Sequence, residues 1–168
     1  MNFKEIIDAS PNQPWYIYKT PMFMLNVSVV VMYENIIYMV PSTTYGIYED
    51  SYKFPGGSIK AGQETIQFSA VRHVKEQTGI RLYKDLLMPI DFQSDPSMSP
   101  EGNVVDIGML CMLEKNPENM IFDNEGKYNV AFIEVDFEKK DVLRKGIQIH
   151  ENSQMLLKRA IEVSIIVQ

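Results

Sequence analysis

The sequence predicts a single mixed α/β domain. Its 168 residues carry 45% hydrophobic and 23% charged side chains, an ordinary globular composition with enough apolar surface for a sizeable core. Short β-prone segments recur along the chain, and two helix-length segments accompany them. No internal repeat, low-complexity tract or linker divides the sequence. We therefore expect one folded unit built from both kinds of element.

The order of the predicted elements follows from the hydrophobic pattern. Residues 24–32 are rich in valine and predict a buried strand, and residues 36–40 predict its returning partner across a turn at Glu34 and Asn35. Residues 41–51 form a loop whose tyrosines could line a pocket mouth. Further strands are expected at residues 86–92, 104–114 and 129–135, and a short helix or turn at residues 136–144. Residues 151–163 predict a closing amphipathic helix with Met155, Leu156, Ala160 and Val163 as its apolar stripe.

Charge and cysteine content exclude several functional classes. The net charge of −6 argues against nucleic acid as a general partner, because phosphate binding needs clustered lysine and arginine. Cys111 is the single cysteine, which excludes an intramolecular disulfide, and its apolar surroundings favour a buried small hydrophobe over a nucleophile. The N-terminus does not read as a signal peptide, and no apolar run reaches the roughly 20 residues that span a bilayer. We expect a cytoplasmic protein without a membrane segment.

The most informative stretch covers residues 54–80. Phe54 and Pro55 lead into a glycine pair, Gly56-Gly57, which allows a tight turn and close approach of the backbone to a ligand. A helix is expected at residues 64–78, and Gly79 stands where a helix C-terminal glycine belongs. At helical spacing, Phe68, Val71 and Val74 share one face, whereas His73, Glu76 and Gln77 share another. The polar face either is ordinary helix surface or presents metal ligands.

These residues resemble the Nudix box, whose pattern is G-x5-E-x7-R-E-U-x-E-E-x-G-U with U aliphatic. Glu64, Arg72 and Glu76 stand at matching positions, as do Val74, Gly79 and Ile80. The spacer from Gly57 to Glu64 is one residue longer than the pattern, His73 replaces a glutamate, and Gln77 replaces the second of the paired glutamates. The resemblance implies an α+β fold, namely a Nudix-type α/β/α sandwich with a mixed β-sheet. We expect residues 1–19 to be an N-terminal extension and residues 20–168 to form the Nudix-like domain.

A second resemblance concerns residues 92–105 and the segment around His150. They are similar to the Nudix subgroup that contains ADP-ribose-related hydrolases and Nudix-type regulators of NAD metabolism. That subgroup carries an Arg-Asp-Pro-Arg-Gly turn, but both arginines are missing here and Glu101 lies in that region. Asn26 stands in place of the usual strand aspartate, and we expect the protein to lack the DNA-binding domain that follows in the regulators. Arginine is the natural partner of a diphosphate, so these departures weaken the ADP-ribose assignment.

The resemblance assigns roles to the candidate site residues. Glu76 is the expected ligand of Mg²⁺ or Mn²⁺, because hard cations prefer carboxylate oxygens. Glu64 and Arg72 are expected to pair and steady the loop on the helix. His73 is either a base or ligand for a softer metal, or a solvated helix-face histidine, which we favour. The remaining candidates are Gly56, Gly57, Phe54, Glu101 and Asp106 on the substrate side, with Asp95 as a further loop carboxylate; Asp106 either points into the cleft or is an exposed edge-strand residue.

Two functions remain open at this level. The first is a Nudix-type hydrolase that acts on, or binds, a nucleoside diphosphate linked to another moiety, such as ADP-ribose or a nucleotide sugar, with weakened or non-standard metal-dependent hydrolysis. The second is a catalytically inactive module that serves as a nucleotide sensor or a protein-interaction domain. In both cases the expected partner is a nucleotide-type small molecule. A homodimer is expected by resemblance, with the aromatic patch at residues 15–18 as its candidate surface.

Overall fold

The computed structural model describes residues 24–42, 51–60, 62–94, 104–118, 128–143 and 146–167. The aromatic patch at residues 15–18, Asp95 and Glu101 lie outside these ranges. The described elements are β1 (Met24–Tyr33), β2 (Ile36–Pro41), β3 (Ser51–Lys53), β4 (Gly56–Ser58), α2 (Ile66–Thr78), η2 (Lys84–Leu86), β5 (Leu87–Gln93), β6 (Val104–Leu113), β7 (Ala131–Asp136), β8 (Asp141–Leu143), β9 (Gln148–Ile149) and α4 (Glu151–Val167).

Strand β1 is the centre of a mixed sheet. It pairs in parallel with β6 along its whole length, from Met24 opposite Val104 to Tyr33 opposite Leu113. It pairs antiparallel with β2 through the predicted hairpin and antiparallel with β4 at its other end. The main path of the sheet runs β5-β6-β1-β2-β3-β9, with β7 paired to β2 and β8 paired to β7. Both strand directions therefore occur in one sheet, as expected for the mixed class.

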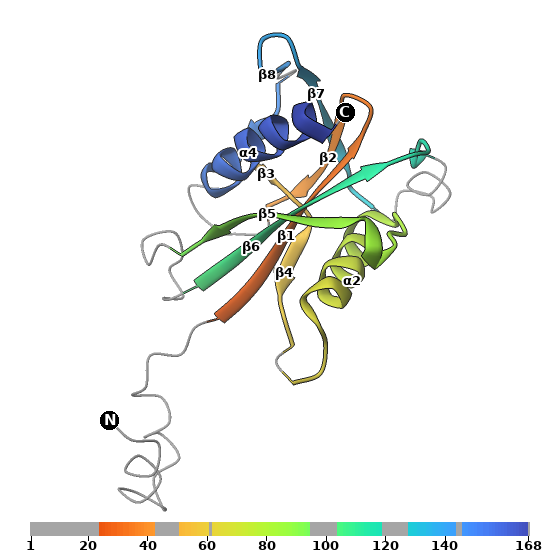
Figure 1. Cartoon of the computed structure of the whole chain (residues 1–168), viewed down its shortest axis with the longest axis vertical. Coiled ribbons are helices and arrows are strands. Elements are labelled where there is room, and N and C mark those ends of the chain that lie inside the picture. The colour runs from red at the N-terminus through yellow and green to blue at the C-terminus, as the bar shows by residue number, and fades with distance from the viewer. Residues whose placement is uncertain are drawn as a thin grey trace, which may run out of the picture.

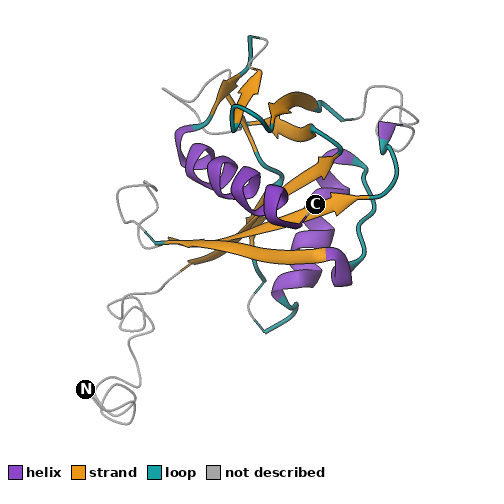
Figure 2. Cartoon of the chain, turned by 45° about the horizontal axis from the view of Figure 1, so that its top comes forward, coloured by secondary structure: helices purple, strands orange, loops and turns teal. Residues whose placement is uncertain are grey.

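The two helices cover opposite sides of this sheet (Figures 1 and 2). Successive side chains of a strand point to opposite faces, and β1 uses both faces for packing. Val27, Val29 and Val31 pack in the core on the α2 side, whereas Val30 and Met32 pack in the core on the α4 side. A strand buried on both faces explains the continuous run of valines in the sequence. The predicted α/β/α sandwich is confirmed.

Several elements differ from the sequence-based expectation. Helix α4 continues to Val167 rather than ending near residue 163. Its buried stripe contains Leu156, Leu157, Ala160 and Ile161, whereas Met155, assigned to that stripe from the sequence, is 57% exposed. Strands β3, β4, β8 and β9 were not predicted, because two or three residues carry too little hydrophobic pattern to be recognised. Each is held by backbone pairing to a longer neighbour.

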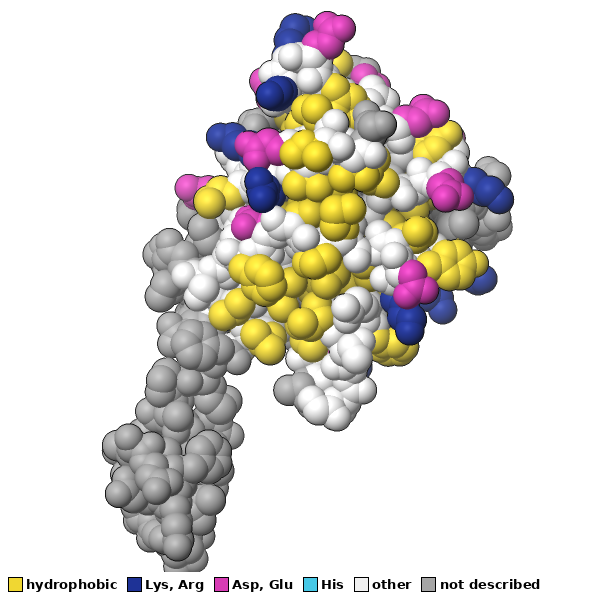
Figure 3. Space-filling model, in the orientation of Figure 1, with side chains coloured by type: hydrophobic (Ala, Val, Ile, Leu, Met, Phe, Trp, Pro, Cys, Tyr) yellow, Lys and Arg dark blue, Asp and Glu magenta, His cyan; other side chains and the backbone are white. Residues whose placement is uncertain are grey.

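Apolar side chains are not confined to the two cores. Figure 3 shows them gathered on the face of the molecule on which α4 and β5 lie. Among the exposed apolar side chains of α4 and β5 are those of Met88, Phe92 and Ile165, with exposures of 37%, 68% and 37%. Within the described residues, no helix combines the length and the apolar character needed to cross a membrane.

Candidate functional site

Helix α2 is fixed at both ends by its own sequence. The hydroxyl oxygen of Thr65 accepts a hydrogen bond from the backbone N–H of Phe68 at 3.2 Å, which satisfies one of the free N–H groups at the helix start. Gly79 adopts the left-handed conformation at the C-terminal end, with φ of 78°. The buried side of the helix is formed by Ser69, Ala70, Val74 and Thr78. Phe68 was expected on the apolar side but is 60% exposed.

Glu64 and Arg72 form the ion pair that the sequence predicts. Arg72 Nη2 lies 2.6 Å from Glu64 Oε1, and Arg72 Nε lies 2.9 Å from Glu64 Oε2. The backbone N–H of Lys60 also donates to Glu64 Oε1 at 2.8 Å. The side chains are 4% exposed for Glu64 and 17% exposed for Arg72. The hydrogen bonds from Arg72, together with the one from Lys60, lower the pKa of Glu64 to about 2. The pair joins the loop before the helix to the middle of the helix.

Arg72 also reaches Glu76 one turn further along α2. Arg72 Nη1 lies 3.2 Å from Glu76 Oε2, and the Glu76 side chain is 58% exposed. The charges of Glu64 and Glu76 both raise the pKa of Arg72, with the hydrogen bond to Glu64 as the largest cause. Glu76 therefore keeps an exposed carboxylate, whereas both oxygens of Glu64 are already engaged.

The imidazole ring of His73 lies against Gly57. A Cβ atom placed on Gly57 would lie 2.7 Å from His73 Cε1, closer than such atoms approach in proteins. His73 Nε2 lies 3.1 Å from the carbonyl oxygen of Ser58 and 3.3 Å from Arg72 Nη2. The carbonyl can only accept and the guanidinium can only donate, so Nε2 can bond one of them in a given tautomer. In either case this ring nitrogen is occupied within the protein, unlike that of a solvated histidine.

Gln77 binds the backbone of Gly56 through both ends of its amide. Gln77 Oε1 accepts from the Gly56 N–H at 3.0 Å, and Gln77 Nε2 donates to the Gly56 carbonyl oxygen at 2.8 Å. Gly56 itself packs so closely on β1 that a Cβ atom would overlap the carbonyl oxygen of Val27. Gly56 therefore cannot carry a side chain, and its polar groups on the side of α2 are satisfied by Gln77.

Asp106 lies away from this group, on the α4 side of the sheet. It is an interior residue of β6, opposite Asn26 on β1, and its Oδ2 accepts a hydrogen bond from Ser28 Oγ at 2.7 Å. Asp106 Oδ1 and Asn26 Oδ1 are buried and have no hydrogen-bond partner within the described residues. Burial raises the pKa of Asp106, and the Ser28 hydroxyl and Lys53 oppose that shift. The alternative of an exposed edge-strand aspartate is wrong.

The structure thus brings together six of the sequence-predicted residues: Gly56, Gly57, Glu64, Arg72, His73 and Glu76. Phe54, expected on the substrate side, is 2% exposed and packs in the core on the α4 side. Cys111 is fully buried, as expected, and burial raises the pKa of its thiol to about 11.

The described residues do not form a site that fits Mg²⁺ or Mn²⁺. Such cations take several carboxylate or carbonyl oxygens. Within the described ranges, no group of three or more His, Cys, Asp or Glu side chains is placed to hold a metal ion. Both oxygens of Glu64 accept bonds from Arg72, and the Gln77 amide is bound to Gly56. The exposed carboxylate of Glu76 is one ligand, which is too few for a hard cation.

A cavity of ≈ 450 Å³ lies along the exposed side of α2. It is lined by Phe68, Val71, Arg72, Lys75, Glu76 and Tyr128. Lys75 is exposed, and its ammonium group forms no ion pair with a described residue. The cavity therefore combines aromatic side chains, a cation and the exposed carboxylate of Glu76. Its volume falls in the range of roughly 300–1,000 Å³ that is typical of ligand pockets.

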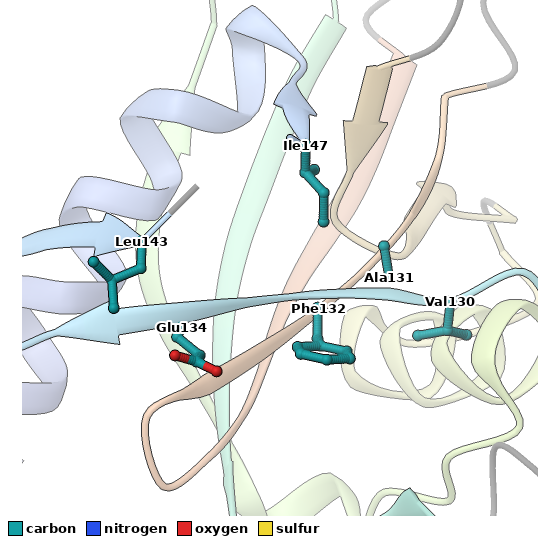
Figure 4. A pocket seen from close by; sticks show the side chains of 6 residues that line it. All are labelled: Val130, Ala131, Phe132, Glu134, Leu143 and Ile147. Carbon is teal, nitrogen blue, oxygen red and sulfur yellow. The ribbon is translucent and has the colours of Figure 1, made fainter. Parts of the chain in front are cut away.

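A second cavity, of ≈ 230 Å³, lies beside β7 and shares no lining residue with the first (Figure 4). Its described lining residues are apolar apart from one carboxylate and comprise Val130, Ala131, Phe132, Glu134, Leu143 and Ile147. None of the described lining residues is a cation that could receive a phosphate group. The cavity along α2 is the better candidate for an anionic ligand.

Sequence reasoning missed three contributions to the site. Gln77 was noted from the sequence as the replacement of a paired glutamate, but not as a partner of the backbone, although its amide matches the donor and acceptor of Gly56. Lys75 and Tyr128 were not singled out as lining residues. The replacement of the second paired glutamate of the pattern by Gln77 was the one sequence signal that could have indicated this role. No local pattern brings Tyr128, which is distant in the sequence, next to α2.

Comparison with known proteins identifies the fold. No family model matches the sequence, and no curated protein matches it. The structure is similar to a MutT/nudix family protein from Enterococcus faecalis, with a TM-score of 0.65 and 18% identity over 98% of this chain and 70% of that chain. It is also similar to the NUDIX domain of Shewanella oneidensis NrtR complexed with ADP ribose, with a TM-score of 0.65 and 13% identity over 98% of this chain and 99% of that chain.

A third similar structure is a bifunctional NMN adenylyltransferase/ADP ribose pyrophosphatase from Francisella tularensis, complexed with AMP and a Mn ion. The TM-score is 0.54 and the identity 18%, and the match covers 98% of this chain but 46% of that longer chain. Each of the three similarities covers 98% of this chain. The chain has the Nudix fold.

Proposed function

We propose that this protein binds a nucleoside diphosphate linked to another moiety, such as ADP-ribose, and hydrolyses it slowly or not at all. The observation that carries the proposal is the cavity along α2, in which Lys75, a lysine without an ion pair among the described residues, lies beside aromatic side chains next to the box. The comparisons support the ligand class, because one similar structure is complexed with ADP ribose and another with AMP.

The lining of the cavity suits the two halves of such a ligand. Phe68, which is 60% exposed, offers an aromatic face on which a nucleobase can stack, and Tyr128 adds a second aromatic side chain to the lining. Lys75 offers an ammonium group for a phosphate oxygen. Arg72 also lines the cavity, but its charge is shared with Glu64 and Glu76. Lys75 is therefore the cation that we expect to contribute most to binding a diphosphate.

We expect weak hydrolysis because most polar residues of the box are engaged in hydrogen bonds or ion pairs within the protein. Diphosphate hydrolysis needs an activated water and neutralisation of the phosphate charge. Glu64 is neutralised by Arg72, and His73 Nε2 is held against Ser58 and Arg72. Glu76 is the box carboxylate that remains exposed, and it borders the same cavity. A residual hydrolytic activity would therefore depend on Glu76.

Calorimetric titration of ADP-ribose into the wild type and two lysine variants tests the proposal. Lys75→Ala should weaken binding about tenfold, the size of one charge-assisted hydrogen bond. Lys158→Ala is the matched control, because Lys158 is an exposed lysine on α4, on the other side of the sheet. Equal affinities for all three proteins would contradict the assignment of the cavity. Phe68→Ala should also weaken binding, by roughly fivefold to a hundredfold, if a base stacks there.

Product analysis on the same samples separates binding from catalysis. We expect little or no AMP after prolonged incubation with ADP-ribose and Mg²⁺ or Mn²⁺. Rapid turnover that Glu76→Gln abolishes would instead identify the protein as a hydrolase, the alternative that the exposed Glu76 carboxylate favours. The homodimer and the domain boundary at residue 20 remain predictions.

A further inference from the structure

The backbone of β4 and its flanking residues is bonded on two sides. On one side, the carbonyl oxygen of Pro55 accepts from the N–H of Val29 at 2.9 Å, and the N–H of Ile59 donates to the carbonyl oxygen of Leu25 at 2.8 Å. These bonds join the segment to β1. Between these positions, Gly56 and Ser58 direct polar groups to the other side, where α2 lies. A strand normally meets a second strand at such an edge.

Side chains of α2 take the place of that second strand. Gln77 bonds both the N–H and the carbonyl oxygen of Gly56, at 3.0 and 2.8 Å. The carbonyl oxygen of Ser58 lies 3.1 Å from His73 Nε2 and 3.4 Å from Arg72 Nη2. Every outward-facing group of β4 named here therefore has a partner on the polar face of the helix.

The spacing of helix and strand explains why this arrangement is possible. His73 and Gln77 are four residues apart, which corresponds to about 6 Å along a helix. Gly56 and Ser58 are two residues apart, which corresponds to about 6.7 Å along a strand. The two repeats nearly coincide, and the helix runs antiparallel to the strand, so that Gln77 meets Gly56 and His73 meets Ser58.

We propose that Gln77, with His73 and Arg72, forms a side-chain edge partner for β4, and that these bonds hold the box together in place of a bound cation. Gln77 is a positioning residue in this arrangement. An amide is required because Gly56 presents one donor and one acceptor. A glutamate at this position would bond the N–H but place its second oxygen against the Gly56 carbonyl oxygen. Restoring the glutamate of the Nudix pattern at position 77 should therefore break the two hydrogen bonds to Gly56 rather than rebuild a metal site.

Thermal unfolding of Gln77→Glu as a function of pH tests this inference without any nucleotide, so its outcome is independent of ligand binding. At pH 7 the variant should melt about 5 °C below the wild type, because one hydrogen bond is lost and two acceptors are opposed. A protonated carboxyl can again donate to Gly56. The pKa of the new carboxyl is therefore raised in the folded state, and the deficit should shrink as the pH falls toward the unfolded value of about 4.3.

Neighbouring charges are the same in the variant and the wild type, so the difference between them at each pH isolates position 77. On α2 the nearest ionisable residues are Arg72, His73, Lys75 and Glu76. The η2 turn, which contacts α2, carries Lys84 and Asp85, while β4 and the paired residues of β1 carry none. Gln67→Glu is the matched control, because Gln67 is an exposed glutamine on the same helix. It should leave the melting temperature nearly unchanged. Gln77→Met should be destabilised equally at every pH, because it can neither donate nor accept in either form.

Amide exchange in the wild type provides a second readout. The Gly56 N–H should be protected in the presence of a chelator, and added Mg²⁺ should not increase that protection. Protection that appears only with Mg²⁺ would overturn the inference. An unchanged melting temperature of Gln77→Glu at pH 7, or a deficit that persists in acid, would overturn it as well.

Discussion

Glu64 and Arg72 form a two-bond ion pair in which Nη2 and Nε of Arg72 lie 2.6 and 2.9 Å from the two carboxylate oxygens of Glu64. Both side chains are mostly shielded from solvent, and the Lys60 backbone adds a third hydrogen bond to the carboxylate. Bidentate pairing of this kind fixes geometry as well as charge. Glu64 therefore holds the loop on α2 and has no free oxygen for a cation.

The pH dependence of folding should report this pair. The pKa of Glu64 is lowered to about 2, so its stabilising contribution is fully present above the unfolded value of about 4.3. The contribution is lost as the pH falls through about 2. Glu64→Gln should lower the melting temperature at pH 7 and reduce the difference from the wild type in acid. Thermal melts followed by circular dichroism at several pH values between about 2 and 7 measure this difference. Glu162→Gln is the control, because Glu162 forms an exposed ion pair with Arg159 on α4. A constant difference at all pH values would contradict the account.

The contribution of Asp106 to stability should have the opposite pH dependence. Burial raises its pKa, so the charged form is disfavoured in the folded state and the protonated form is favoured. Stability is therefore lost as the pH rises through the raised value. Asp106→Asn should increase the melting temperature at pH 7, because it removes a buried charge and can still accept from Ser28 Oγ. The gain should vanish below pH about 4. Asp85→Asn, an exposed aspartate on η2, is the control, and equal effects of the two changes would argue against the buried position.

Gly57→Ala should strain the contact between the glycine turn and His73. The new Cβ would lie 2.7 Å from His73 Cε1, and Gly57 has φ of 157°. We expect a loss of about 1–3 kcal/mol in the free energy of unfolding, as for other overpacked sites. Denaturant unfolding of the single and double variants with His73→Ala tests the cause. The double variant should recover part of the loss, and strictly additive effects would show that the contact is not responsible.

The longer strands, the two helices and the glycine turn that precedes α2 could be predicted from the sequence. The valine run of β1, the hairpin and the glycine at the end of α2 each have a local pattern that determines their structure. Phe68 and Met155 were placed on the wrong side of their helices, because helical spacing alone does not show where the neighbouring strand lies. The two hydrogen bonds between Gln77 and Gly56 join helix α2 to strand β4, and no local sequence pattern shows that these residues meet in the fold.

Calorimetric titration of ADP-ribose into chelator-treated protein, repeated with Mg²⁺, tests the central claim most directly. Because the box is held by side-chain bonds, we predict measurable binding without the metal. The affinity should change less than about threefold when Mg²⁺ is added, and little or no product should form. Binding that requires Mg²⁺, accompanied by turnover that Glu76→Gln removes, would contradict the account and identify a metal-dependent hydrolase.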